Sequence, residues 1–126
     1  MRYKIWQIPH ELIENDDNVA KLLFQDYDYI KEKLKTLNEI LKVYRVIYED
    51  EFTLEDFQSQ FPIAYSTQVE RDINGLKDYE ILELIFERFN INHPDDFKGH
   101  SLSAGDIVQL DDKFYMCNSI GWKEVE

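Results

Sequence analysis

The sequence predicts an α+β domain in which helices pack on one face of a mainly antiparallel sheet. Runs of β-branched and aromatic residues lie at the start, middle and end of the chain, which is typical of separate strands. Apolar residues spaced by three and four follow the first run, which is typical of an amphipathic helix. Asp111 and Asp112 separate two β-type runs and indicate a tight antiparallel turn. A chain of 126 residues has room for one domain, which we expect to span residues 1–126.

Two elements are predicted in the first third of the chain. Residues 3–8 form an opening strand that ends at Pro9, because proline cannot continue a ladder of hydrogen bonds. A long helix then begins near Asp16, where short polar side chains can cap free amides. Its apolar stripe is predicted from spacings of three and four residues. The stripe consists of Val19, Leu22, Leu23, Tyr27, Ile30, Leu34, Leu37 and Leu41.

The remaining elements follow from shorter patterns. Residues 43–49 are predicted to form a middle strand, and a capping signal at Thr53 opens a short helix to about residue 60. Residues 78–90 form a helix with one apolar face. Residues 107–110, 114–118 and 122–125 are predicted to form a C-terminal meander, with Gly121 at a bend.

Composition excludes several classes of protein. Twenty-six acidic residues against fourteen basic ones give a net charge of −12, which disfavours direct nucleic-acid binding through a basic surface. No apolar run is long enough to span a bilayer, and residues 1–6 lack the apolar core of a secretion signal. The single cysteine, Cys117, excludes an internal disulfide. We therefore expect a cytoplasmic protein with no membrane partner.

Several segments carry a resemblance to a known family. They are IFERFNINHPDDF (residues 85–97), GHSLS (99–103), GDIV (105–108) and FYMCNSIGWKEV (114–125), and more loosely YKIWQI (3–8) and VYRVIY (43–48). Together they resemble the YodL-like domain, and the resemblance covers most of the chain. It implies a protein of phages or conjugative elements of Gram-positive bacteria, and it implies no defined biochemical activity.

The chain departs from the family pattern at three places. Residues 53–78 look like an insertion between the middle strand and the main helix, which suggests an added surface. Cys117 and Asn118 stand where the family tends to have Val-Asp, which weakens the idea that an acid at position 118 does chemistry. Ile120 and Trp122 replace phenylalanines.

Polar residues cluster in the loop that follows the main helix. Histidine and aspartate together could supply acid–base chemistry, with Cys117 as a nucleophile, or could bind a metal ion. The spacing matches no compact ligand motif, and Pro94 and Gly99 indicate turns. We therefore predict a structural loop that joins the main helix to the C-terminal hairpin, with no catalytic residue, metal or cofactor. Its residues are His93, Pro94, Asp95, Asp96, Gly99, His100, Ser103 and Asp106.

Acidity is the second feature with a functional interpretation. Residues 51–126 carry sixteen acids against six bases and thus −10 of the net charge. Carboxylates spaced like DNA phosphates could mimic DNA and inhibit a host restriction or CRISPR nuclease. The acids fall mostly on the polar faces of amphipathic helices, which favours the simpler interpretation of a solvated, solubilising surface.

The predicted function is non-catalytic protein binding, as an accessory protein of a phage or mobile element. The partner is expected to be a host or element-encoded protein, with a basic nucleic-acid-binding protein as one such partner. The DNA-mimic inhibitor and a His/Asp hydrolase or metal-binding protein are the alternatives. The predicted binding residues lie in the insertion, where Pro62 blocks a continuous helix. They are Phe57, Phe61, Ile63 and Tyr65.

Overall fold

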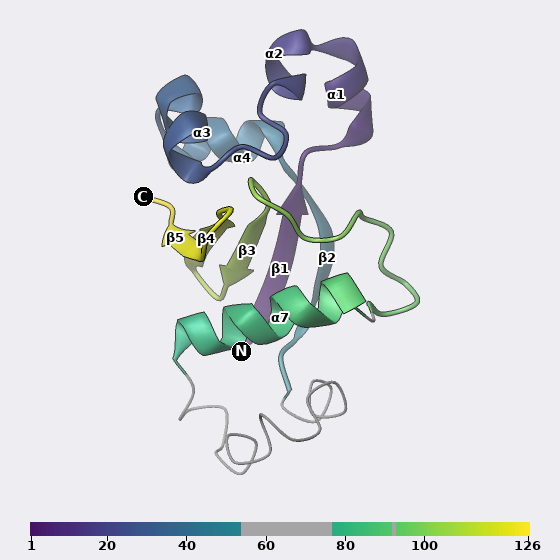
Figure 1. The fold of residues 1–126 in the computed structure, drawn as a ribbon. Helices are drawn as coiled ribbons and strands as arrows, with labels where there is room; N and C mark the ends of the chain where they lie inside the picture. Colours follow the sequence, from purple (N-terminus) through teal and green to yellow (C-terminus); the bar gives the residue numbers. More distant parts are fainter. Residues whose placement is uncertain (54–76, 92) are drawn as a thin grey trace.

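The computed structural model describes residues 1–53, 77–91 and 93–126. It contains a five-stranded antiparallel sheet with the strand order β2-β1-β3-β4-β5, together with five helices in the described residues (Figure 1). The predicted α+β class with an antiparallel sheet is therefore confirmed. The strands are β1 (Arg2–Gln7), β2 (Arg45–Glu51), β3 (Ile107–Leu110), β4 (Lys113–Cys117) and β5 (Trp122–Glu124). The helices are α1 (His10–Asn15), α2 (Asp17–Ala20), α3 (Tyr27–Leu34), α4 (Leu37–Val43) and α7 (Asp78–Ile91).

β1 lies in the interior of the sheet and pairs with both β2 and β3. The opening strand, the middle strand and the three strands of the meander are confirmed, with ends shifted by one or two residues. β2 is an edge strand, and its register against β1 shifts between Ile5 and Trp6. Val46 in this strand is exposed, whereas Tyr44, just before the strand, is buried.

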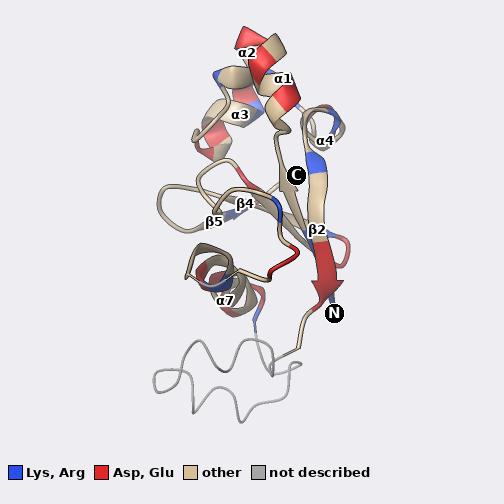
Figure 2. Cartoon of the chain, turned by 90° about the vertical axis from the view of Figure 1, so that its right-hand side faces the viewer, with Lys and Arg blue, Asp and Glu red and all other residues tan. Residues whose placement is uncertain are grey.

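The hydrophobic core consists of two clusters on opposite faces of the sheet. Ile107 and Val108 are neighbours in β3 but belong to different clusters, because successive strand residues point to opposite faces. Val108 packs with α7 residues such as Ile85, so the main helix covers one face. The expectation that the helices lie on one face only was wrong, because the N-terminal helices pack against the other face. Ile107 packs with residues of the N-terminal helices, including Ile30. Figure 2 shows α7 beside the strands and the N-terminal helices gathered at one end of the sheet.

The prediction of one long N-terminal helix was wrong. The segment forms α2, α3 and α4, with left-handed backbone at Phe24 (φ 61°) and Lys35 (φ 62°) between them. Asp16 caps α2 and Thr36 caps α4, so the segment contains several local start signals. A spacing of three and four residues cannot distinguish one helix from several short helices that face the same core. Ile40, outside the predicted stripe, is fully buried after the second break.

The predicted main helix is confirmed as α7, which buries Ile81, Leu82, Ile85 and Phe89. The predicted turn at Asp111 and Asp112 is confirmed between β3 and β4. In the part of the chain that the structure describes, no helix is both long and apolar enough to cross a membrane. The predicted binding residues of the insertion, Phe57, Phe61, Ile63 and Tyr65, lie outside the described residues.

Candidate functional site

The loop between α7 and β3 holds the predicted cluster of polar residues. Phe97 and Leu102 anchor this loop in the core beneath α7. Gly99 passes so close to the sheet that an added Cβ would lie 2.2 Å from Ile47 Cδ1 and 2.4 Å from Gln7 Oε1. Only glycine fits this approach without a shift of its neighbours. The loop is thus fixed against β1 and β2 as well as against α7.

A buried polar network connects the loop to β1. The Gln7 side chain is 2% exposed, and its Nε2 donates to Asp106 Oδ2 at 3.0 Å and to the His100 carbonyl at 2.9 Å. The Ser103 amide donates to the same Asp106 oxygen at 3.0 Å. Sequence reasoning missed Gln7. The signal was available, because Gln7 shares the inward register of Tyr3 and Ile5 in a strand that alternates.

His100 and Asp106 are the two predicted residues whose ionisable groups come together. His100 Nδ1 lies 2.7 Å from the Ser101 carbonyl and 3.7 Å from Asp106 Oδ2, with the imidazole side chain 44% exposed. Burial raises the pKa of Asp106 from its usual 3.8 to about 7, against the opposing effects of His100, the Ser103 amide and Gln7. The Asp106 carboxyl therefore changes its charge near neutral pH, beside an imidazole, which makes it a candidate acid or base.

The other predicted loop residues do not join this pair. His93 packs its ring against Phe97 at 5.4 Å and places Nδ1 2.9 Å from the Pro94 carbonyl. Asp95 and Asp96 are exposed. Within residues 1–53, 77–91 and 93–126, no three histidine, cysteine or acidic side chains are grouped so that they could hold a metal ion.

Cys117 does not have the character of a nucleophile. Its side chain is buried in β4, and burial, followed by the charge of Asp106, raises the pKa of the thiol to about 12. The thiol is protonated at neutral pH, whereas the thiolate is the reactive form. Its neighbour Asn118 accepts a hydrogen bond from the Tyr27 amide at 2.8 Å, at the start of α3. Asn118, which stands where the family tends to have Asp, therefore makes a structural contact in this chain.

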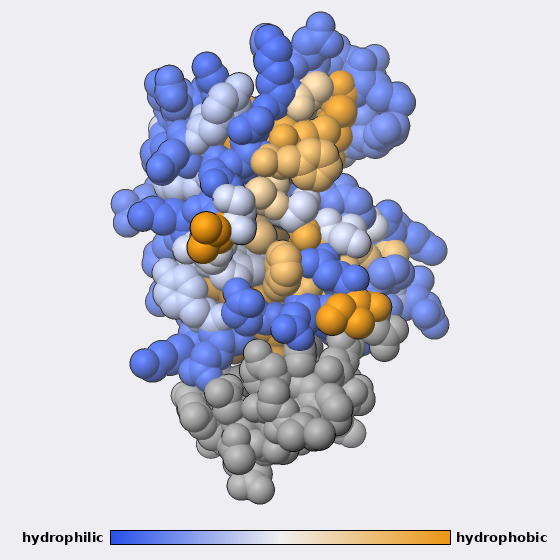
Figure 3. Space-filling view, viewed as in Figure 1, coloured by the Kyte–Doolittle hydropathy of each residue, from blue (hydrophilic) through white to orange (hydrophobic). Residues whose placement is uncertain are grey.

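Exposed apolar side chains define a second candidate site. The most exposed large ones in the described residues are Phe24 (67%), Ile91 (76%) and Ile120 (91%). Figure 3 shows apolar atoms of the N-terminal helical region, of the β4–β5 turn and of the C-terminal end of α7 on one side of the molecule. We call Phe24, Ile91 and Ile120 the apolar face.

Hydrogen bonds join the two parts of this face that carry Phe24 and Ile120. The Ser119 amide and hydroxyl donate to the Asp26 carboxylate at 2.7 and 2.8 Å, which ties the β4–β5 turn to the segment that carries Phe24. A cavity of about 160 Å³ lies between α7 and the turn, and Phe86 and Trp122 line it with an edge-to-face contact. Trp122 Nε1 donates to Glu83 at 2.9 Å. Acidic residues therefore border the exposed apolar side chains.

The described acidic residues do not form a continuous surface. Figure 2 shows acidic residues on the N-terminal helices, at the end of β2 and on α7, with basic residues between them. Glu49 pairs with Arg2, Glu51 pairs with the N-terminal amine, and Asp78 lies 3.8 Å from Lys113. This mixture favours the interpretation of a solvated surface over that of a DNA mimic.

Comparisons with known proteins identify the family. No curated protein and no solved structure matches the chain. The sequence model of the YodL-like domain family matches residues 2–126. This span includes both sheet edges, α7 and the loop that carries His100 and Asp106. The chain therefore belongs to the YodL-like domain family.

Proposed function

We propose that this YodL-like protein acts by binding another protein and not by catalysis. The observation that carries the proposal is Phe24, an aromatic residue with left-handed backbone (φ 61°) whose side chain is 67% exposed. For a bulky residue, left-handed backbone raises the free energy of the folded protein by on the order of 1 kcal/mol or more. An exposed ring buries little apolar surface to offset this. Strain at an exposed aromatic residue is typical of a contact made with a partner.

The residues around Phe24 hold it in position. Leu22 and Tyr27 are buried on either side of it, at 3% and 7% exposed. The Gln25 amide bonds to the Leu22 carbonyl, and the Gln25 carbonyl lies 3.2 Å from the position that a Cβ of Gly105 would take. The segment is thus anchored at both ends and presents Phe24 outward. A rigid aromatic anchor loses little conformational entropy on binding.

The side chains of the apolar face indicate which chemistry a partner surface needs. Phe24, Ile91 and Ile120 offer apolar anchors, while Asp26, Glu83 and Glu87 supply negative charge near them. Burial and the charge of Glu83 raise the pKa of Glu87. A basic group of a partner near Glu87 would lower this pKa again. We propose a partner with an apolar pocket and a basic rim. A host or element-encoded nucleic-acid-binding protein in the bacterial cytoplasm fits this description, in the setting of a phage or mobile element.

A comparison of two glycine variants tests the proposal. Phe24→Gly removes the ring at one left-handed position, and Lys35→Gly makes the same backbone change at another. Both proteins and the unmodified chain are used to capture partners from a Gram-positive host lysate. A protein retained by the unmodified chain and by Lys35→Gly, and lost with Phe24→Gly, supports the proposal. Equal capture by all three proteins contradicts it.

Acid–base hydrolysis at His100 and Asp106 is a second candidate function. The 3.7 Å approach of the two groups, and a pKa of about 7 for Asp106, favour it. His100→Gln retains a polar side chain and removes the titrating imidazole. Loss of a hydrolytic activity with an unchanged melting temperature would support the enzyme, whereas an activity that persists would exclude this pair as its source.

DNA mimicry is a third candidate, favoured by the charge of −10 in residues 51–126. The test reverses four exposed acids that lie outside the proposed binding face, Asp95, Asp112, Glu124 and Glu126, to lysine. A mimic loses binding to a basic nuclease while it remains folded. Binding that survives this reversal contradicts mimicry.

A further inference from the structure

A pocket of about 520 Å³ lies among α2, α3 and the end of α4, apart from the apolar face. Its size is that of pockets that bind small molecules. Nine residues from these three helices and the segments that join them line it: Asp16, Asn18, Val19, Lys21, Leu22, Tyr29, Lys33, Leu34 and Val43. The breaks at Phe24 and Lys35 create this space, because one continuous helix could not fold back on itself.

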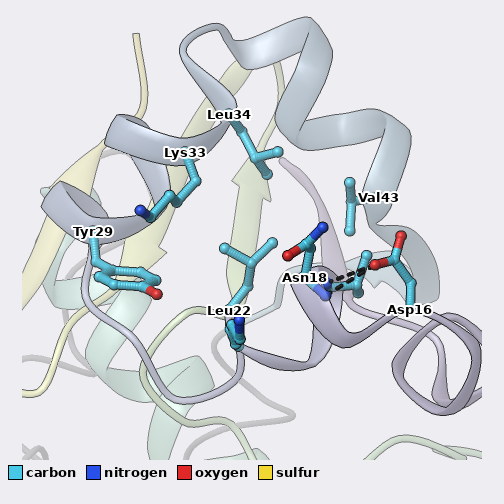
Figure 4. Close-up of a pocket in the computed structure, with 9 residues that line it drawn as sticks. Asp16, Asn18, Leu22, Tyr29, Lys33, Leu34 and Val43 are labelled. Carbon is cyan, nitrogen blue, oxygen red and sulfur yellow. Dashed lines mark hydrogen bonds between the residues drawn. The ribbon is translucent and has the colours of Figure 1, made fainter.

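The pocket has an apolar middle and polar ends. Figure 4 shows Leu22 and Leu34 between Lys33 and Tyr29 on one side and Asp16 and Asn18 on the other. Lys33 Nζ lies 5.5 Å from the centre of the Tyr29 ring, so a cation and a phenol occupy the same end. Asp16 at the far end uses its carboxylate to cap α2, accepting from the Asn18 amide at 2.9 Å. The two ends therefore differ in charge.

Two lysines, Lys21 and Lys33, contribute the positive charge among the residues that line the pocket. None of the ion pairs among the described residues involves Lys21 or Lys33. The whole chain carries −12, yet eight of its fourteen basic residues lie in the first fifty. Both lysine side chains are exposed, so an anion that enters the pocket can approach their ammonium groups.

We propose that this pocket binds a small organic anion with an apolar body. Its carboxylate lies at Lys33 and Tyr29, where an ammonium and a hydroxyl can donate to it. Its hydrocarbon part covers Leu22, Leu34 and Val43. Lys21 adds a second positive charge at the rim. This binding is independent of the proposed protein partner and of the apolar face.

Two matched probes test the charge requirement. 4-Phenylbutyrate and its neutral amide are titrated into the full chain, and the methyl signals of Val19, Leu22, Leu34 and Val43 are followed by NMR. The carboxylate is expected to shift these signals saturably and to bind at least tenfold more tightly than the amide. Inorganic phosphate, which lacks an apolar body, is expected to leave the methyl signals unchanged.

Two lysine variants test whether the carboxylate binds at Lys33. Lys33→Gln is expected to weaken binding of 4-phenylbutyrate at least fivefold, whereas Lys42→Gln, an exposed lysine of α4 that does not line the pocket, leaves it unchanged. Three outcomes overturn the proposal: no saturable shift, equal binding of the amide, or equal loss in both variants.

Discussion

At Asp106, burial disfavours the ionised form of the carboxyl group. Its carboxyl group is 5% exposed and its pKa is raised from 3.8 to about 7, so the folded protein binds this proton more tightly than the unfolded chain does. A raised carboxyl pKa contributes stability at pH below 3.8, and this contribution is lost as the pH rises toward 7.

Asp106→Asn isolates this contribution. Asparagine keeps an oxygen that accepts from Gln7 Nε2 and the Ser103 amide, but it does not titrate. The free energy of unfolding of the unmodified protein minus that of the variant is expected to fall by roughly 2 to 4 kcal/mol between pH 4 and pH 7. Denaturant titrations at several pH values measure it. A difference that is constant with pH would mean that Asp106 titrates normally.

Substitutions at Gly99 and Gly121 compare the cost of steric overpacking with the cost of backbone strain. At Gly99 an added methyl group meets Ile47 and Gln7, whereas at Gly121 (φ 74°) it meets no described atom within 4 Å. Gly99→Ala is expected to lower the free energy of unfolding by about 2 to 3 kcal/mol through overpacking. Gly121→Ala should cost only about 1 kcal/mol, through its backbone conformation. Equal costs would show that the loop can move away from β2.

At the scale of elements, the sequence predicts the sheet better than the N-terminal helices. Strands end at clear signals, such as Pro9 and the turn at Asp111, and those ends are close to the observed ones. The apolar spacing from Val19 to Leu41 contains no proline or glycine, so nothing in it marks the break at Phe24.

The candidate sites were predictable to different degrees. His100 and Asp106 stand close together in the sequence, so their proximity was predictable. Their link to Gln7 was not predictable, because it joins neighbouring strands from opposite ends of the chain. Exposure of Phe24 agrees with its place outside the predicted apolar stripe, whereas its left-handed backbone was not predictable from that spacing. The expectation for Phe57, Phe61, Ile63 and Tyr65 stays a prediction.

Lys35→Gly tests whether the helical segment is broken. At a left-handed position, glycine removes strain and should raise the free energy of unfolding by up to about 1 kcal/mol. In the interior of a continuous helix the same change would lower it by about 1 kcal/mol. The sign of the change, measured by thermal or denaturant unfolding, distinguishes the two arrangements.

At the scale of the whole molecule, the fold sets the geometry of the proposed binding face. The net charge of −12 keeps the chain soluble, and ion pairs such as Arg2–Glu49 interrupt its acidic surface. The two core clusters hold α7, the β4–β5 turn and the N-terminal helices around one sheet. The apolar face crosses all three of these parts, so its geometry depends on the complete fold.

The affinity of Phe24→Gly for a captured partner, measured beside its stability, tests this account most directly. The ring is 67% exposed and its backbone is left-handed, so the free energy of unfolding should change by less than about 1 kcal/mol. Loss of a central aromatic anchor should weaken binding by about 2 kcal/mol or more, roughly thirtyfold. Lys35→Gly should bind like the unmodified chain. Unchanged affinity of Phe24→Gly would contradict the proposed binding face.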